Sequence, residues 1–138
     1  MLPSGLPDLV GDSESLSRFL RQTNLFSREK GIAKAAAFLP DPAPDCRNTS
    51  VFRIGDEPEL LRSTWTREAP GQPLRGVALF TADCVRRVGL DVIAEEPPLR
   101  HANLEGWPWK DSDAELQKAA QKECALQIAS QTTLVLLD

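Results

Sequence analysis

The segment LRGVALFTADCVRRVGLDVIAEE, residues 74–96, combines both kinds of secondary structure in one short run. Its first seven residues, LRGVALF, are typical of a buried strand, and its last seven, LDVIAEE, favour a second strand. Between them, Thr81 can cap a helix that carries Asp83 in its first turn and ends at Gly89. This helix is short for a crossover between parallel strands. The segment therefore predicts helices and strands within one domain, the α+β class.

Near the start of the chain, the stretch DSESLSRFLRQTN favours a helix. Leu16, Phe19 and Leu20 recur there at the i, i+3, i+4 spacing of one helical face. Arg18 and Arg21 are three residues apart, so they would be neighbours on another face of the same helix. The sequence thus predicts two adjacent cations on an exposed helical surface.

The rest of the chain completes a small domain. TSVFRI alternates as a strand, with Ser50, Phe52 and Ile54 on one face. Periodic apolar residues predict helices at 57–67 and 111–131, and the tail TLVLL is either a final strand or an apolar tail that docks on a neighbour.

These elements predict the domain organisation. Residues 1–12 are expected to form an irregular N-terminal arm, and residues 13–138 a single α+β domain. That domain should have about three or four helices packed on a short mixed sheet.

The composition narrows the classes of function. With a net charge of −4, the 138-residue chain lacks the basic excess of a protein that binds nucleic acid regardless of sequence, although residues 18–34 form a local basic run. It shows neither a secretory signal nor an apolar run long enough to span a membrane. Its three widely spaced cysteines and one histidine match no disulfide framework and no metal site. We expect a cytoplasmic protein with no metal, no cofactor and no membrane contact.

The stretch RHANLEGWPWK, residues 100–110, holds the single histidine and two of the three tryptophans. His101 could act as a general base, or bind a phosphate or carboxylate together with the preceding arginine. Trp107 and Trp109 could stack on a base or on a peptide proline. Alternatively, the tryptophans fill space between the last helix and the sheet, while His101 and Asn103 hydrogen-bond backbone in an irregular connector. The sequence favours the connector, because buried aromatic and satisfied polar groups are the commoner case.

Several cations could form an anion site if the fold brings them together. The candidates are Arg18, Arg21, Arg53 and the pair Arg100–His101. ADP-ribosyl transfer folds also place an arginine on an early strand, as VFRI would, but their serine/threonine-rich strand and late glutamate have no counterpart that can be assigned. Phosphate-loop, dinucleotide, metalloprotease and serine-hydrolase motifs are missing. Scattered, solvated arginines are the alternative.

Three stretches, SRFLRQTNLFSREKGIAKAAAFLP, TSVFRI and RHANLEGWP, resemble a group of small bacterial proteins. That group has R-F-x-R, A-F-L-P, S-V-F-R and R-H-A-N-x-x-G-W-P motifs, and the resemblance covers roughly residues 17–129. Its motif positions are Arg18, Arg21, Phe52, Arg53, Arg100, His101, Asn103, Gly106 and Trp107. The resemblance implies an architecture and supplies no activity. Leu25 departs from the histidine that is more usual there, which would remove a second histidine from any shared site.

Two classes of function follow from these observations. The first is a small soluble bacterial accessory protein that docks on a larger protein partner, within a multi-gene system such as toxin–antitoxin or phage defence. Trp65, Trp107 and Trp109 would be its anchors, because interface energy concentrates in tryptophan and arginine. The alternative acts on a phosphate-bearing ligand or nucleic acid through a pocket built from Arg18, Arg21, Arg53, Arg100, His101 and Asn103. Since no enzyme motif is present, the sequence favours the accessory protein.

Overall fold

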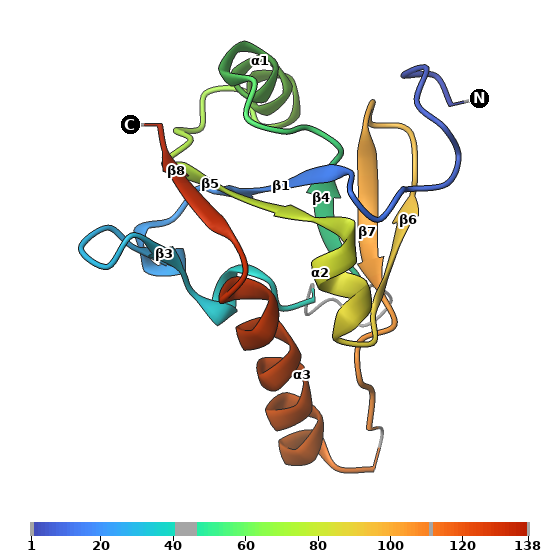
Figure 1. The fold of residues 1–138 in the computed structure, drawn as a ribbon. Helices are drawn as coiled ribbons and strands as arrows, with labels where there is room; N and C mark the ends of the chain where they lie inside the picture. Colours follow the sequence, from blue (N-terminus) through green and yellow to red (C-terminus); the bar gives the residue numbers. More distant parts are fainter. Residues whose placement is uncertain (1, 41–46, 111, 138) are drawn as a thin grey trace.

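A six-stranded sheet forms the centre of the protein. In the computed structural model, residues 2–40, 47–110 and 112–137 are described. The strands of the sheet are β1 (Ser15–Leu20), β4 (Thr49–Phe52), β5 (Gly76–Thr81), β6 (Asp91–Ala94), β7 (His101–Glu105) and β8 (Thr133–Leu136). Their order across the sheet is β6-β7-β4-β1-β5-β8 (Figure 1).

Three helices and several short elements surround this sheet. The helices are α1 (Pro58–Glu68), α2 (Ala82–Arg87) and α3 (Ala114–Ala129). The short elements are the 3₁₀ helices η1 (Thr23–Leu25) and η2 (Ala35–Ala37) and the ribbon strands β2 (Phe26–Ser27) and β3 (Ile32–Ala33). Helix α1 lies on one side of the sheet, and α2 and α3 lie on the other (Figure 1). The predicted α+β class is confirmed.

The sheet differs from the prediction in one respect. Every described strand pair is antiparallel, whereas a mixed sheet was expected. Strand β5 and strand β6 do not pair with each other, although they are joined by α2. The short α2 is thus no crossover between parallel neighbours, in keeping with the length such a crossover needs.

The elements with strong local signals lie close to their predicted positions. The helix expected at 57–67 is α1, with Pro58 in its first turn. The strand, helix and strand predicted within residues 74–96 are β5, α2 and β6. The long helix is α3, whose N-cap Asp113 accepts a hydrogen bond from the N–H of Leu116 at 3.0 Å. The tail forms strand β8 rather than a free extension. Within the described residues, no helix combines the length and apolar character that a membrane crossing requires.

The helix predicted near the start of the chain is wrong, because this segment forms the central strand β1. It pairs with β5 along its whole length and with β4 through Ser17 and Phe52. Leu16 and Leu20, both fully buried, face one side of the sheet, while Ser17 and Phe19 face the other. Residues four apart share a face in a strand as well as in a helix. Hydrogen bonding to a neighbour on both edges makes this segment a strand, and local periodicity alone does not distinguish a strand from a helix here.

The connector predicted after Arg100 is also wrong in part. Residues 101–105 form β7, which pairs with β4 on one side and β6 on the other. Its residues alternate between polar and apolar as in a strand, and the polar side chains of His101 and Asn103 are buried as well, 8% and 5% exposed. Gly106, with φ 91, ends the strand in the left-handed region that favours glycine.

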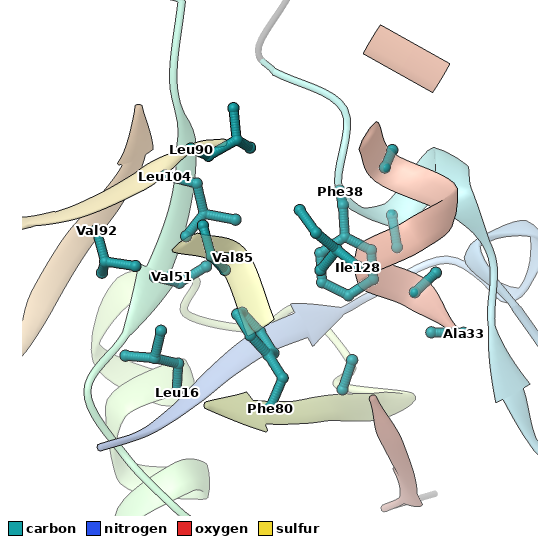
Figure 2. Packing of buried hydrophobic residues seen from close by; sticks show 14 of the residues in the cluster. Leu16, Ala33, Phe38, Val51, Phe80, Val85, Leu90, Val92, Leu104 and Ile128 are labelled. Atoms are coloured by element: carbon teal, nitrogen blue, oxygen red, sulfur yellow. The ribbon is translucent and has the colours of Figure 1, made fainter. Parts of the chain in front are cut away.

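The main hydrophobic core lies on the face of the sheet covered by α2 and α3. Figure 2 shows Leu16, Val51, Leu104, Phe80 and Ile128 among the side chains that meet there. A smaller cluster fills the opposite face under α1. Its buried members are Phe52, Ile54, Leu61 and Val77. The sheet is therefore covered on both faces, while Ser50 of β4 remains exposed.

The N-terminal arm is held against the body of the domain. Ser4 donates from its N–H and its hydroxyl to the carboxylate of Glu96, at 2.9 and 2.5 Å. Asp12 accepts from Nη1 of Arg86 at 2.6 Å. Val10 is buried in the main core. The arm is thus ordered by intramolecular contacts at several points along its length.

Candidate functional site

A pocket of about 350 Å³ lies beside the C-terminal half of β1. Its lining includes Arg18, Phe19, Arg21, Ser50, Phe52 and Trp65. A volume of this size is near the lower end of the roughly 300–1,000 Å³ that is typical of small-molecule sites. The pocket combines cations, aromatic rings and a hydroxyl group within one small space.

Arg18 ties three segments together at the pocket. Its Nε donates to the carbonyl of Ala37 and its Nη1 donates to the carbonyl of Ser50, both at 2.8 Å. Strands β1 and β4 pair through Ser17 and Phe52, and the guanidinium bonds the Ser50 carbonyl just beyond that pair. Because the N–H donors of a guanidinium lie in one rigid plane, these two bonds fix the orientation of Arg18 in the pocket wall.

Arg21 and Glu68 bring two further charges to the lining. Arg21 directly follows β1 and is exposed. Glu68 ends α1, and its carboxylate accepts a hydrogen bond from Nε of Arg67 at 2.9 Å. The lining thus carries two guanidinium groups and one carboxylate, a composition that favours an anion.

Three aromatic rings form the apolar part of the pocket. The ring centroid of Phe19 lies 5.2 Å from that of Phe52 and 5.5 Å from that of Trp65, with the Trp65 ring edge-on. The indole Nε1 of Trp65 donates to the carbonyl of Gln72 at 2.8 Å, which fixes the ring. Rings held in this way offer a rigid surface on which a flat ligand group can pack.

Ser50 and His101 form a hydrogen-bonded pair at the edge of this pocket. The Oγ of Ser50 lies 2.6 Å from Nε2 of His101, and Nδ1 of His101 lies 2.9 Å from the carbonyl oxygen of Glu95. A carbonyl oxygen can only accept, so Nδ1 carries the proton. In the neutral ring, Nε2 is then an acceptor aimed at the Ser50 hydroxyl. His101 is buried against Phe52, whereas Ser50 is exposed.

Asn103 stands behind this pair rather than in the pocket. Its Nδ2 donates to the Glu95 carboxylate at 2.9 Å. Glu95 is therefore held at both ends, by Asn103 at its side chain and by His101 at its carbonyl. Asn103 was predicted to contribute to a ligand site. In the structure its amide orients Glu95 instead.

Arg53 is in a different place from the predicted anion site. Its side chain is fully buried and forms two bonds with the Glu14 carboxylate, Nε to Oε2 at 2.5 Å and Nη2 to Oε1 at 2.8 Å. Its Nη1 donates to the carbonyl of Pro7 in the N-terminal arm at 2.8 Å. Hydrogen bonding to Glu14 raises the pKa of Arg53, although burial opposes this. Arg53 directly follows β4, and its bonds to Glu14 and Pro7 direct its side chain to the N-terminal arm instead of the pocket.

Arg100 also lies outside the pocket lining. Its backbone has φ 67, its N–H donates to the Glu96 carboxylate at 3.1 Å, and its carbonyl accepts from the N–H of Arg53 at 2.7 Å. Of the predicted cations, the fold thus brings Arg18 and Arg21 into one pocket and connects His101 to it through Ser50.

The three tryptophans differ in their surroundings. Trp107 is 5% exposed and belongs to the main core, so it cannot anchor a partner as the accessory hypothesis predicted. Its Nε1 has no hydrogen-bond partner among the described residues. Trp109 is half-buried, with the guanidinium of Arg47 4.2 Å from its ring centroid. Trp65 lines the pocket. The interpretation of Trp107 as a space-filling residue is the one that agrees with the structure.

Comparison of the chain with protein-family models, with curated proteins and with solved structures finds no match. The resemblance to a group of small bacterial proteins therefore stays a prediction. In the part of the chain that the structure describes, no three histidine, cysteine, aspartate or glutamate side chains gather as a metal site would require.

Ser50 is the residue that sequence reasoning missed. The alternation of TSVFRI already places Ser50 and Phe52 on one strand face. No sequence signal, however, shows that β4 pairs with β7 so that Ser50 lies opposite Asn103 and Phe52 opposite His101. This register brings His101 diagonally across from Ser50, within reach of its hydroxyl.

Proposed function

We propose that this protein binds a small ligand that carries a phosphate group and a flat apolar part, of about the size of a nucleoside monophosphate. The observation that carries the proposal is that Arg18 and Arg21 line the same pocket of about 350 Å³ as three aromatic rings. Guanidinium groups match the geometry and charge of phosphate. Aromatic rings pack on a flat group without selecting one base over another.

The size and charge of the protein favour a small ligand over a long nucleic acid. A nucleic-acid groove needs cations along many phosphates, and the chain as a whole has a net charge of −4. Two arginines at one pocket suit a single phosphate group. Of the cations predicted to bind a phosphate-bearing ligand, Arg18 and Arg21 would do so, whereas Arg53 and Arg100 lie outside the pocket.

The accessory-protein hypothesis stays a prediction with less support. It relied on tryptophan anchors, and Trp107 is a core residue. Trp65 packs against Phe19 in the wall of the pocket. Trp109, half-buried under Arg47, keeps surface that a partner protein could cover, and the half-buried Trp65 exposes its surface within the pocket.

Calorimetric titration with AMP tests the proposal, with adenosine and inorganic phosphate titrated separately. We expect AMP to bind more tightly than either part alone, and added salt to weaken its binding. The Arg21→Ala variant should bind AMP about 10- to 100-fold more weakly, because a hydrogen bond to a charged group contributes about 1.5–3 kcal/mol.

Arg62→Ala is the matched control, because Arg62 is an exposed arginine of α1 outside this pocket. Equal loss of AMP binding in both variants, or no AMP binding by the unmodified protein, would contradict the proposal. A single-stranded oligonucleotide that binds more tightly than AMP would indicate a nucleic-acid ligand instead.

A further inference from the structure

We infer that Ser50 is a nucleophile activated by His101, and that the pocket cleaves phosphate esters. The inference rests on the proposed function for its substrate class, because the phosphate held by Arg18 and Arg21 would be the group that Ser50 attacks. It rests on separate geometry for its chemistry, namely the hydrogen bonds of the Ser50–His101 pair.

The pair has the arrangement that an activated serine requires. The distance of 2.6 Å between Ser50 Oγ and His101 Nε2 is a short hydrogen bond between a hydroxyl and an imidazole. The acceptor nitrogen is free to take the serine proton, since the Nδ1 proton is engaged by the Glu95 carbonyl at 2.9 Å. A nucleophile, a base and a group that orients the base are the three parts of this kind of site.

The orientation of His101 is supported by a further shell of contacts. The Glu95 N–H donates to the carbonyl of His101 at 3.0 Å, so the two residues are joined in both directions. Asn103 holds the Glu95 carboxylate at 2.9 Å. The His101 ring also packs edge-on against Phe52, with centroids 5.5 Å apart. Glu95 and Asn103 are thus positioning residues, and neither lines the pocket.

Exposure separates Ser50 from a hydroxyl that only supports the fold. The neighbouring Thr49 is 1% exposed and donates to the carbonyl of Phe38 at 2.7 Å, as a buried hydroxyl must. Ser50 is exposed, lines the pocket and bonds a buried imidazole rather than backbone. A base shielded from water beside an accessible hydroxyl is the arrangement that favours attack on a bound substrate.

The arginines decide the substrate class. In phosphoryl transfer, negative charge spreads over the equatorial phosphate oxygens, and positive groups aimed at them stabilise the transition state. Arg18 and Arg21 lie in the same pocket as the Ser50 hydroxyl. This juxtaposition favours a phosphate ester over an uncharged carboxylic ester.

The reaction balances with water as the only co-substrate. The Oγ of Ser50 forms a bond to phosphorus while the P–O bond to the alcohol breaks. The Ser50 proton passes to Nε2 of His101 and from there to the departing alkoxide. Water then attacks the phosphoserine and loses its proton to Nε2, and Oγ of Ser50 leaves and regains a proton. The products are the free alcohol and inorganic phosphate.

Two measurements on the full chain test this inference. The first is hydrolysis of p-nitrophenyl phosphate, which we expect from the unmodified protein and expect to fall at least about 100-fold in Ser50→Ala. The second is covalent labelling by a fluorophosphonate probe, followed by mass spectrometry of the labelled peptide. Ser63 is the internal control, because it is exposed and its hydroxyl only bonds the Leu60 carbonyl at 3.2 Å.

We expect Ser50 to be labelled at least about 100-fold faster than Ser63, and His101→Gln to remove most of this difference, since a positioned base contributes about 10²–10⁴-fold. Circular dichroism establishes that His101→Gln is folded before its rate is compared. If that variant does not fold, the comparison of Ser50 with Ser63 in the unmodified protein decides. Equal labelling of the two serines overturns the inference, as does hydrolysis that Ser50→Ala leaves unchanged.

Failure of this inference is distinguishable from failure of the proposed function. AMP binding by Ser50→Ala without labelling or hydrolysis in the unmodified protein leaves a binding pocket and removes the catalyst. Fast labelling of Ser50 without AMP binding and without phosphate-ester hydrolysis removes the phosphate substrate class and the proposed ligand together.

Discussion

Arg53 shows how one buried cation orders a terminal segment. Its guanidinium joins the segment that follows β4 to Glu14 and to the carbonyl of Pro7. With its side chain fully buried, removal of either charge leaves the other without its partner. Arg53 therefore contributes to stability and not to the pocket.

The Arg53→Ala variant should therefore lose stability and keep its ligand. We expect the free energy of unfolding to fall by about 2–4 kcal/mol, because Glu14 loses both of its bonds and the arm loses an anchor. Urea denaturation measures the loss, and AMP titration at a temperature where the variant is folded checks the pocket. A tenfold loss of AMP affinity in the folded variant would show that Arg53 acts on the site after all.

The candidate residues themselves could be found from sequence only in part. Arg18, Arg21 and His101 are chemically conspicuous, and they do meet at or beside one pocket. Ser50 is one of many serines and carries no distinguishing signal. Arg53 carried the same signal as Arg18, and only its bonds to Glu14 and Pro7 in the folded structure place it away from the pocket.

The elements divide according to where their stabilising contacts come from. Helices α1 and α3 have apolar periodicity and a local start signal, Pro58 in α1 and the Asp113 cap in α3, so their positions could be predicted. Strands β1 and β7 lie between two partners in the sheet. Their hydrogen bonds come from distant segments, so the local pattern of a short strand such as β7 is weak beside the pairing that forms it.

The N-terminal arm is an element whose order should depend on pH. Burial raises the pKa of Glu96, but hydrogen bonds from the Ser4 hydroxyl, the Ser4 N–H and the Arg100 N–H outweigh it, so the pKa lies below its ordinary value of 4.5. Since the pKa is lowered in the folded state, the stabilisation is fully present above about pH 4.5 and is lost as the pH falls through the folded value.

We expect the amide of Ser4 to lose its protection from hydrogen exchange as the pH is lowered from neutral to below the pKa of Glu96. In Glu96→Gln, protection should be weaker at neutral pH and should no longer change with pH, because the side chain does not titrate. The control is Glu115→Gln, which changes an exposed residue of α3. An identical pH profile in Glu96→Gln would show that another group holds the arm.

The whole molecule is stabilised by the core on the α2 and α3 side of the sheet. Leu16 is fully buried near the start of β1 and belongs to that cluster. Strand β1, which carries Leu16, lies between β4 and β5 in the middle of the sheet. Loss of this side chain should therefore weaken the cooperative unit and not a local segment.

Leu16→Ala should lower the free energy of unfolding by about 2–5 kcal/mol, because it removes buried methyl groups and leaves a cavity. Leu126→Ala is the matched control, since Leu126 on α3 is 53% exposed, and such a change should stay within about 0.5 kcal/mol. Chemical denaturation followed by tryptophan fluorescence reports both. Equal effects of the two substitutions would mean that the core assignment of β1 is wrong.

By itself, the sequence determined the α+β class and the positions of the three helices, because apolar periodicity and helix-terminal residues act over a few neighbouring positions. It also determined which side chains carry charge or titratable groups. Only the tertiary structure decided that residues 15–20 and 101–105 are strands, that Arg53 orders the arm, and that Ser50 meets His101 beside Arg18. Each of these depends on hydrogen bonds and burial between segments far apart in the chain, which no local pattern encodes.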